Sequence, residues 1–407
     1  MKKCIRCGLP DYKIAFGRKK LHIDDEHTCI YCHDFNTHQD LYTVDFKNNQ
    51  RRFHALCDQL RGAHTYDAVL MYTGGKDSGY AAYFLSKVMK LNILALTWDN
   101  GFFSKENMAN MTVLTEKLGI EHKIISIGEK NLSQYYRNRF INLGRFCPCT
   151  QPALFFCAPE IAASSAPMII MGVSFGQQLA ILQNRLLFEF DDEQKSSILR
   201  VLRQQGMGLS SFQDPGFFIH ALLDIASGNY TPDMVELLRA CVRQFQKLHT
   251  GDRTIVILSL IYNFDHDTIS RVLSEYGWKK PSGAHHAGHT SCIMEPMKGF
   301  VSSQQGMINL DYLELAAERR WGRFPEELYD EVLPTLYYNE KEPEALETFL
   351  KITRLTKDEF YAVLRKNPLA HAAPPEINWN LMDTLGIQMG RDQLTQLLTQ
   401  AYQRNIP

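Results

Sequence analysis

The chain lacks the features that assign many proteins to a class at first sight. Its 407 residues contain no apolar run long enough to span a bilayer, so we expect no membrane helix. The start, Met-Lys-Lys-Cys-Ile-Arg-Cys, is basic, but no apolar stretch follows it, and we do not expect a secretory signal peptide. The formal net charge of -1 gives no overall attraction to nucleic acids. A local basic patch stays open, with 195–203 or 18–20 as candidates.

Internal repeats and low-complexity tracts are also absent. Apolar residues make up 45% of the chain, an ordinary content for a globular protein, and the length predicts two or three domains. There are ten cysteines, but nothing marks the chain as secreted. We therefore interpret the cysteines as metal ligands or reactive thiols in a reducing cytoplasm, not as disulfides.

Four of the cysteines form two closely spaced pairs, Cys4-x-x-Cys7 and Cys29-x-x-Cys32. Two such pairs can place four thiolates around Zn2+. The surrounding segment has so little apolar sequence that it could hardly fold without a metal. Because four thiolates leave no open coordination position, we predict a structural zinc site. His33 is an alternative ligand, but we interpret it as a bystander.

The stretch from Asp67 to Tyr80 is the most informative part of the sequence. Residues 68–72 form a short apolar run that is typical of a buried parallel strand. Gly74 and Gly75 permit a tight turn, and a helix is predicted to begin near Ser78. A strand, turn and helix in this order point backbone N–H groups outward at a helix N-terminus, which suits a phosphate or pyrophosphate.

This loop is not a Walker A motif, because its glycines are adjacent and no Gly-Lys-Ser/Thr follows them. The run Thr73-Gly74-Gly75-Lys76-Asp77-Ser78 resembles the pyrophosphate loop (PP-loop) of N-type ATP pyrophosphatases, Ser-Gly-Gly-x-Asp-Ser. The resemblance implies Mg2+-dependent cleavage of ATP between its α and β phosphates. AMP would be transferred to a substrate oxygen and PPi would leave on the loop. It makes all six residues ATP-binding candidates, with Lys76 and Asp77 also catalytic.

From Tyr66 onward, strand-like and helix-like segments alternate, which predicts an α/β fold with a parallel, doubly wound sheet. Strands are expected at 68–72, 91–97, 122–127 and 167–172, with 254–262 as a strand or a buried helix. Helices are expected at 106–118, 133–143, 153–164 and 267–276. Ligands on such sheets bind beyond the carboxyl ends of the strands. Asp99 and Gly172 follow two of these strands, so we add both to the ATP-binding candidates, although Asp99 could equally cap its turn.

The sequence divides into five predicted regions. A zinc-ribbon-like segment is expected at 1–40, the PP-loop core at 41–182, a helical insertion at 183–250, the completion of the core at 251–300, and a helical C-terminal region at 301–407. The resemblance implies a sheet of the adenine nucleotide alpha hydrolase type for the core.

Three further cysteines are candidates for chemistry: Cys147, Cys149 and Cys292. The first two lie in a polar, loop-like Cys-Pro-Cys run, and the third lies far away in a loop with three histidines. They could bind three irons of a [4Fe–4S] cluster, or one could carry a persulfide as nucleophile. The histidines of that loop, 285, 286 and 289, are interpreted as solvated, with metal binding as the alternative.

A wider resemblance covers 1–180 and 270–365 but not 183–250. The order Cys-x-x-Cys-Gly-Leu-Pro, second Cys-x-x-Cys, linker helix and Gly-Gly-Lys-Asp-Ser is similar to N-acetyl sugar amidotransferases of surface-polysaccharide and flagellin-glycan pathways. A related branch, the PP-loop tRNA thiolases, joins zinc knuckles to this loop and adds three cluster-binding cysteines. That family pattern has Cys-x-x-Cys where this chain has Cys147-Pro-Cys149.

Both branches imply adenylation of a carbonyl or amide oxygen, followed by attack of sulfur or ammonia. We favour sulfur, because ammonia transfer needs no cysteine at the adenylate. The substrate is then a nucleobase, a tRNA base or a small metabolite, supplied with a sulfur donor. The amidotransferase alternative needs a nucleotide-linked sugar and a separate glutaminase. A homodimer stays open for either. A third alternative is a nucleotide-binding module without turnover, which the intact Lys76, Asp77 and Ser78 argue against.

Overall fold

The computed structural model contains a six-stranded sheet of order β4-β3-β2-β5-β7-β6. The structure describes residues 2–11, 13–14, 21–145, 147, 150–212, 222, 224–226, 228–281, 292–308, 310–324, 326, 329, 332, 341–366, 376–387 and 390–403. The strands are β2 (Ala68–Met71), β3 (Ile93–Trp98), β4 (Glu121–Ile125), β5 (Met168–Met171), β6 (Leu209–Ser211) and β7 (Thr254–Ile257). All neighbouring pairs are parallel except β6 with β7, which is antiparallel. The predicted α/β fold is confirmed.

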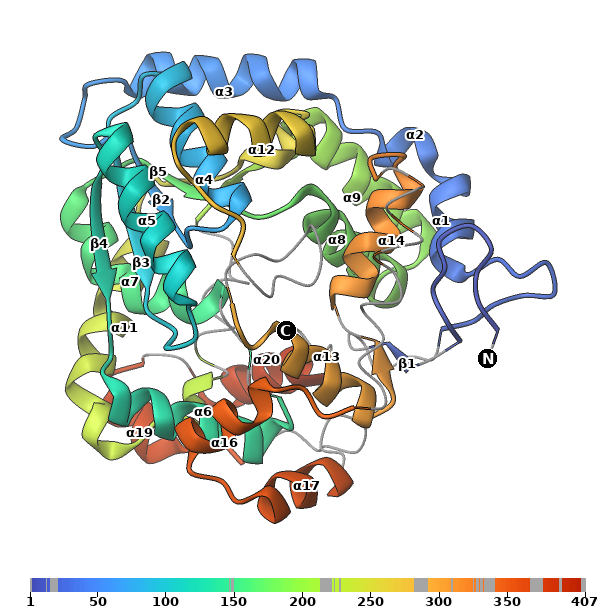
Figure 1. The fold of residues 1–407 in the computed structure, drawn as a ribbon, viewed down its shortest axis with the longest axis vertical. Coiled ribbons are helices and arrows are strands. Elements are labelled where there is room, and N and C mark those ends of the chain that lie inside the picture. Colours follow the sequence, from blue (N-terminus) through green and yellow to red (C-terminus); the bar gives the residue numbers. More distant parts are fainter. Residues whose placement is uncertain are drawn as a thin grey trace.

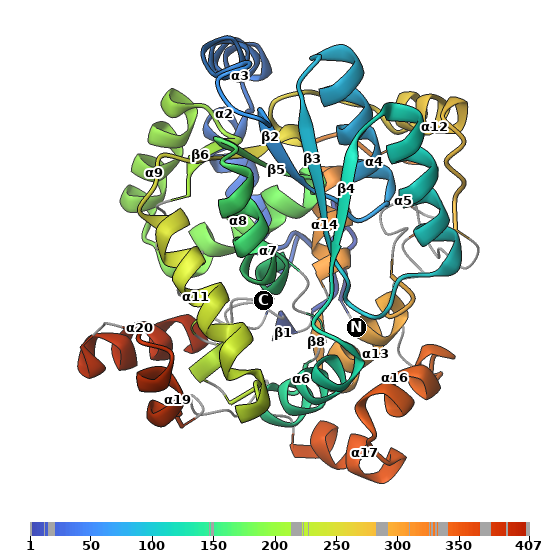
Figure 2. The ribbon, with the colours of Figure 1, turned by 90° about the vertical axis from the view of Figure 1, so that its left-hand side faces the viewer.

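Helices cover both faces of this sheet, because the central strands are apolar on both sides. In β2, Val69 and Met71 face one core, and Ala68 and Leu70 face the other. The first core contains α6 (Glu129–Leu143), α7 (Thr150–Ser164) and α11 (Val235–His249). The second contains α3 (Phe46–Leu60), α4 (Lys76–Tyr83), α5 (Lys105–Leu118) and α12 (His266–Glu275), and Figure 2 shows α4, α5 and α12 together on that side.

The remaining elements lie around this layered centre (Figure 1). They are β1 (Lys13–Ile14), α1 (Ile30–Thr37), α2 (Gln39–Tyr42), the π-helix Phe84–Val88, α8 (Phe175–Glu189), α9 (Asp192–Gln205), the 3-10 helices Pro232–Met234 and Leu258–Leu260, α13 (Glu295–Gln304), β8 (Met307–Ile308), α14 (Leu310–Arg320), α16 (Ala345–Thr353), α17 (Lys357–Lys366), α19 (Trp379–Thr384) and α20 (Arg391–Gln403). None of the helices within the described ranges is long and apolar enough to cross a membrane.

The predicted helical region 183–250 contributes more than helices. It carries β6, which extends the main sheet as an antiparallel edge strand next to β7. The pattern of the sequence did not indicate this strand, because Leu209–Ser211 is only three residues long and follows two glycines. The region is therefore built into the sheet as well as packed against it.

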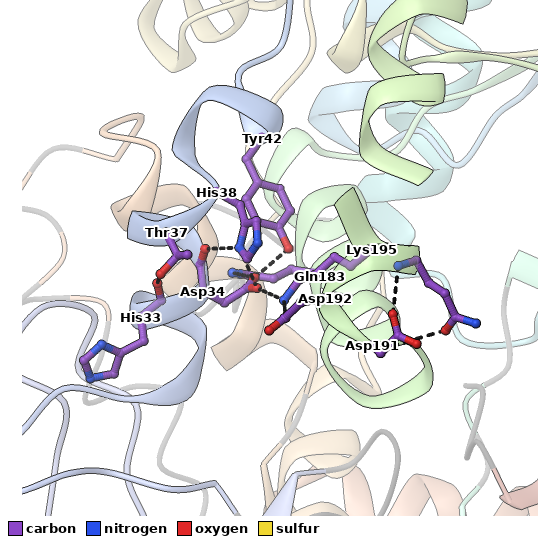
Figure 3. Close-up of polar contacts among 10 residues, drawn as sticks. His33, Asp34, Thr37, His38, Tyr42, Gln183, Asp191, Asp192 and Lys195 are labelled. Carbon is purple, nitrogen blue, oxygen red and sulfur yellow. Dashed lines mark hydrogen bonds and ion pairs between the residues drawn. The ribbon is translucent and has the colours of Figure 1, made fainter. Parts of the chain in front are cut away.

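A buried polar network fastens this region to the N-terminal segment (Figure 3). Asp34 of α1 pairs with Lys195 of α9 at 2.6 Å and accepts hydrogen bonds from Tyr42 at 2.6 Å and Gln183 at 3.0 Å. Both charged side chains are almost completely buried, with 2% and 5% exposure for Asp34 and Lys195. A buried charge needs its partner, so the network fixes α1 against α8 and α9.

The N-terminal segment also contacts the chain near residue 310. β1 pairs in parallel with β8, and the Tyr312 hydroxyl donates to the carbonyl of Gly8 at 3.1 Å. In Figure 1 the dark-blue segment lies beside α14 (orange), and α14 packs along α8 (green). One helix thus stands between the N-terminal cysteines and the carboxyl end of the sheet.

Candidate functional site

The PP-loop run follows β2 and opens α4, as the sequence predicts. Gly75 occupies the N-cap position of α4, where it has no side chain to cap the first turn. Gly74 has φ +70°, and a Cβ atom there would lie 2.5 Å from Met111 Cγ and 3.0 Å from the carbonyl oxygen of Asn107. Glycine is required at this position by both its conformation and its surroundings.

Two side chains hold the loop by its carbonyl groups. Asn107 Nδ2 donates to the carbonyl of Thr73 at 2.6 Å, and Trp278 Nε1 donates to the carbonyl of Gly74 at 2.9 Å. In a trans peptide the C=O and the following N–H point in opposite directions. The N–H groups of Gly74 and Gly75 therefore point away from Asn107 and Trp278. Together with the N-terminus of α4, this arrangement suits a phosphate.

The polar side chains of the loop contact one another. Thr73 N–H donates to Ser78 Oγ at 3.2 Å, and the two hydroxyl groups are 3.1 Å apart. Lys76 Nζ lies 2.8 Å from Asp77 Oδ1. Lys76 is buried, whereas Asp77 is half-buried and lines a cavity. The structure thus places the side chains of four predicted residues around one turn: Thr73, Lys76, Asp77 and Ser78.

The other two predicted ATP-binding residues have visible structural roles. Asp99 Oδ1 accepts the N–H of Gly101 at 2.9 Å, so the carboxylate caps the turn after β3, the second of the two predicted alternatives. A Cβ atom at Gly172 would lie 2.7 Å from Ser78 Cβ, so the glycine lets the end of β5 approach α4. Gly172 also lines the cavity that Asp77 reaches.

This cavity has a volume of about 330 Å³ and opens at the carboxyl ends of β2, β5 and β7. Its walls come from α4, the loops after β5 and β7, and the segment that follows α14. They include Asp77, Tyr80, Gly172, Ser259, His266, Glu318 and Arg323. The volume is within the range of small-molecule sites.

Charged groups meet along the α14 wall of the cavity. Glu318 Oε1 accepts the N–H of Gly176 at 2.7 Å, and Glu318 Oε2 lies 3.9 Å from Arg323 Nε. Burial, opposed by Arg323 and reinforced by Glu314, raises the pKa of Glu318 to about 7. Burial, together with the Lys76 ammonium, lowers the pKa of His266, so its imidazole is neutral at pH 7. Lys76 and Asp77 of the PP-loop act on His266 in opposite directions, so the loop lies close to this wall of the cavity.

Cys147 and Cys292 pack against the same apolar core, and Cys147 lies near enough to act electrostatically on Cys292. Burial, with a contribution from the Cys147 thiol, raises the pKa of Cys292 to about 12. Cys292 forms an antiparallel bridge with Phe103, just after the β3 turn, so Cys292 lies at the carboxyl end of the sheet. Cys292 Sγ also accepts the N–H of Met294 at 3.4 Å. Cys149, together with His285, His286 and His289, lies outside the described residues.

An ion pair between a half-buried lysine and a buried aspartate lies near these thiols. Lys298 Nζ is 2.6 Å from Asp311 Oδ1, and Asp311 is buried. Burial alone would lower the pKa of Lys298, but Asp311, followed by Cys147, raises it, so the lysine is charged.

One face of α14 connects the thiol pair to the cavity. Asp311, Glu314 and Glu318 follow each other at intervals of three and four residues, which places them on the same side of a helix. Asp311 contacts Lys298, Glu314 accepts the hydroxyl of Ser174, and Glu318 accepts the N–H of Gly176. At 1.5 Å per residue, Asp311 and Glu318 are about 10 Å apart along the helix axis.

The four N-terminal cysteines converge as predicted. Their sulfur atoms all lie within 4.8 Å of one another, and all four residues are buried. Cys4 and Cys32 sulfurs are 3.8 Å apart, and those of Cys7 and Cys29 are 3.6 Å apart. A tetrahedral ion about 2.3 Å from each sulfur holds the sulfurs about 3.8 Å apart. The geometry fits a single thiolate-bound ion such as Zn2+.

Arg320, at the end of α14, lies against this four-cysteine site. Its three guanidinium nitrogens are buried and have no hydrogen-bond partner in the part of the chain that the structure describes. Burial tends to lower the pKa of Arg320, but Cys7, Cys32 and Cys29 outweigh it and raise the pKa. The guanidinium therefore faces the thiols as a positive charge.

A scan against protein-family models matches residues 49–142 to NAD synthase. The match covers β2, the loop from Thr73 to Ser78, β3 and β4. Residues 49–142 form a PP-loop domain of the NAD synthase-like superfamily. The PP-loop domain thus has the same strand, turn and helix that the sequence predicts for adenine-nucleotide binding.

Solved structures resemble the PP-loop domain and its surroundings only distantly. A U34-tRNA thiolase, NcsA from Methanococcus maripaludis with its [4Fe-4S] cluster, matches at 13% identity and TM-score 0.33, covering 92% of this chain and 89% of that chain. An NH3-dependent NAD synthetase from Campylobacter jejuni matches at 15% identity and TM-score 0.23, covering 51% and 97%. A predicted subunit of a tRNA methyltransferase from Methanocaldococcus jannaschii matches at 20% identity and TM-score 0.21, covering 41% and 92%. A search of curated proteins found no match.

Several residues of the site carry no signal in the sequence. Asn107 and Trp278 hydrogen-bond to the PP-loop although they lie 29 and 200 residues after Ser78 in the sequence. Glu314 and Glu318 look like the solvated face of an ordinary helix, but both are buried. Their spacing of four residues was the one available indication that they share a face.

Proposed function

We propose that the chain is an ATP pyrophosphatase that adenylates a carbonyl or amide oxygen of its substrate and releases PPi. The observation that carries the proposal is the PP-loop. Its Thr73 and Gly74 carbonyls accept hydrogen bonds from Asn107 and Trp278, so the following N–H groups point to the opposite side. The freed N–H groups, with the N-terminus of α4, supply the fixed dipoles that stabilise a pyrophosphate leaving group.

In this proposal the loop side chains have separate roles. Lys76 adds a positive charge for the departing PPi, while Asp77 orients Lys76 and helps to place Mg2+ and the phosphates. Mg2+ supplies charge neutralisation at the phosphates when it is bound. Ser78 fixes the turn through Thr73.

The second step is proposed to replace the adenylated oxygen with sulfur. Cys147 and Cys292 support this assignment, because they come from distant parts of the sequence, pack against the same apolar core and influence each other electrostatically, with Cys292 beside the turn after β3. Two thiols at that place could carry a persulfide or, with Cys149, bind a [4Fe–4S] cluster. A sulfur donor and a nucleobase, tRNA base or small-metabolite acceptor are then required.

Ammonia transfer to a nucleotide-linked N-acetyl sugar is the second candidate. It is favoured by the surroundings of the thiols: both cysteines pack against the larger apolar core, and Cys292 Sγ accepts a backbone N–H, as a structural thiol does. In this case a separate glutaminase would supply the ammonia.

The adenylation step is tested by identifying the products formed from ATP. We expect AMP and PPi, with Asp77→Ala losing turnover while the fold is retained. Asp191→Ala is a suitable control, because that exposed carboxylate caps α9 and does not line the cavity. ADP and phosphate as the products would refute the assignment.

The nucleophile is identified by supplying sulfide and ammonium in competition and weighing the product by mass spectrometry. Thiolation predicts a sulfur-containing product that each of Cys147→Ala, Cys149→Ala and Cys292→Ala abolishes, while ATP binding persists. An aminated product formed equally well by the triple variant would establish the amidotransferase alternative.

A further inference from the structure

Three residues that line the cavity beside the PP-loop have a buried polar atom without a hydrogen-bond partner in the described part of the chain. Arg323 Nη1, His266 Nδ1 and Ser259 Oγ are buried, and none has a hydrogen-bond partner within the described ranges. Leaving such a group unpaired costs roughly 1–3 kcal/mol, and more when it is charged. Three of them around one cavity indicate that a ligand completes their hydrogen bonds.

Contacts with Phe175 and Phe264 hold the Arg323 side chain in place. Its guanidinium lies 3.7 Å from the ring centroid of Phe175, and its Nη2 donates to the carbonyl of Phe264 at 3.3 Å. The planar group is therefore fixed on one face and at one nitrogen, and Nη1 still lacks an acceptor among the described residues. The aromatic rings of Tyr80 and Phe264, 4.7 Å apart, form an apolar wall that suits a flat ring.

Glu318 gives the cavity a group that can exchange a proton. One carboxylate oxygen is occupied by the N–H of Gly176, and the other is 3.9 Å from Arg323 Nε. The close approach depends on Gly176, since a Cβ atom there would lie 2.5 Å from Glu318 Cγ. Besides Arg323, the charges acting on this carboxyl are Glu314 and Lys76. Its protonation equilibrium near pH 7 suits proton transfer at neutral pH.

The cavity adjoins the PP-loop, which is where the proposed function requires an acceptor of AMP. Asp77 of the PP-loop lines it, and Lys76 and Asp77 both act electrostatically on His266 across it. If PPi leaves on the loop, the attacking oxygen has to approach from the neighbouring space.

We propose that this cavity binds the acceptor, an uncharged ring compound with an amide or lactam group, and that Glu318 removes its N–H proton during adenylation. Arg323, with Ser259, orients the acceptor. The inference rests on the proposed function and adds the position of the acceptor and the group that takes its proton.

The adenylation step forms one bond to phosphorus and breaks another. The acceptor oxygen forms a bond to the α-phosphorus of ATP, and the bond from that phosphorus to the bridging oxygen breaks, with its electron pair leaving on PPi. The N–H electron pair of the acceptor becomes the C=N bond of the adenylated product. The released proton goes to the Glu318 carboxylate.

The test measures binding and turnover separately. Saturation-transfer NMR detects binding of monocyclic lactams, purine lactams and N-acetylated hexosamines to the full chain, with Mg2+ and α,β-methylene-ATP present. We expect at least one compound to bind, Arg323→Leu to weaken that binding roughly 10–100-fold, and Ser259→Val to weaken it less. Ser259→Val covers the case in which Arg323→Leu does not fold.

Turnover is followed as PPi release from ATP with the compound that binds. Glu318→Gln should bind it like the wild type but release PPi on the order of 10²–10⁴-fold more slowly, and the rise in rate near pH 7 should be lost. Glu326→Gln is the control, because that side chain is 82% exposed on the segment after α14.

The outcomes separate the two proposals. If α,β-methylene-ATP binds but no acceptor compound does, or if binding is unchanged in both Arg323→Leu and Ser259→Val, the acceptor site is refuted. Unchanged PPi release in Glu318→Gln refutes the role of Glu318. Absence of ATP-analogue binding and of PPi release in the wild type contradicts the proposed adenylation itself.

Discussion

At the scale of single residues, Glu318 is a buried carboxyl group whose charge the fold tolerates poorly. The ordinary pKa of a Glu carboxyl is 4.5, and in the folded protein it is about 7, chiefly because of burial. A raised carboxyl pKa means that the folded state favours the protonated form. The stabilising contribution is therefore complete below about pH 4.5 and is lost as the pH rises through 7.

We expect the free energy of unfolding to fall by about 3 kcal/mol between pH 4.5 and pH 8 because of this one group. Glu318→Gln has no ionisable group there and should lack this component. Urea unfolding of both proteins across that range measures the difference. Parallel pH curves for the two proteins would show that Glu318 ionises normally.

Arg320 is the second residue whose charge has a clear partner. It faces the thiolates of the four-cysteine site, and a bound Zn2+ with four thiolates keeps a net negative charge that a cation offsets. Arg320→Met should lower metal affinity on the order of 10–100-fold. Competition with a chromophoric chelator measures this. Arg203→Met is the control, since Arg203 is exposed and donates to the carbonyl of Asp40 at 3.0 Å. Equal affinities for both variants would rule out the charge effect.

At the scale of elements, α1 and α9 depend on each other through the pair of Asp34 and Lys195. Removing one partner leaves the other charge buried. Asp34→Ala should therefore destabilise the protein by about 3–5 kcal/mol in thermal or denaturant unfolding.

Asp192→Asn is the control for this pair, because Asp192 contacts the same lysine but is 89% exposed. It should leave stability unchanged, since solvent screens exposed charges. A similar loss in both variants would mean that burial does not decide the strength of the interaction.

The same elements show how far the sequence alone could go. Residues 68–78 could be predicted because strand, glycine turn and helix are local features, and each leaves its own mark in the sequence. The four cysteines could be paired because their spacing reflects metal geometry. β8 and β6 could not be predicted, since strands of two and three residues carry no periodic pattern. The α14 carboxylates were equally hidden, because burial of a charged helix face depends on partners such as Ser174 and Gly176 that lie about 140 positions away.

At the scale of the whole molecule, the four-cysteine site fastens distant parts of the chain together. Tyr329 donates to the carbonyl of Cys7, Tyr312 donates to that of Gly8, and β1 pairs with β8. Arg320 contributes from the helix that also carries Glu318. Loss of the metal or of a cysteine should therefore alter the position of α14 and, with it, of Glu318 in the cavity wall.

Removing the metal should loosen these segments selectively. After chelation, we expect amide hydrogen exchange to rise in 2–11, 21–32 and 307–324, while β2, β3 and β5 keep their protection, because their hydrogen bonds lie within the sheet. Mass spectrometry of peptides resolves these regions. A uniform rise across the chain, or no rise in 307–324, would show that the site does not hold α14.

The pairing of Ile14 with Ile308 has a consequence for the order in which the protein is made. The ribosome releases the four thiols first, and their neighbours β8 and α14 emerge about 300 residues later. At about 5–20 residues per second, this delay lasts roughly 15–60 s. During that time the cysteines lack Arg320 and the Tyr329 contact. We therefore expect the four thiols to be more open to oxidation and to competing metals during synthesis than in the finished molecule.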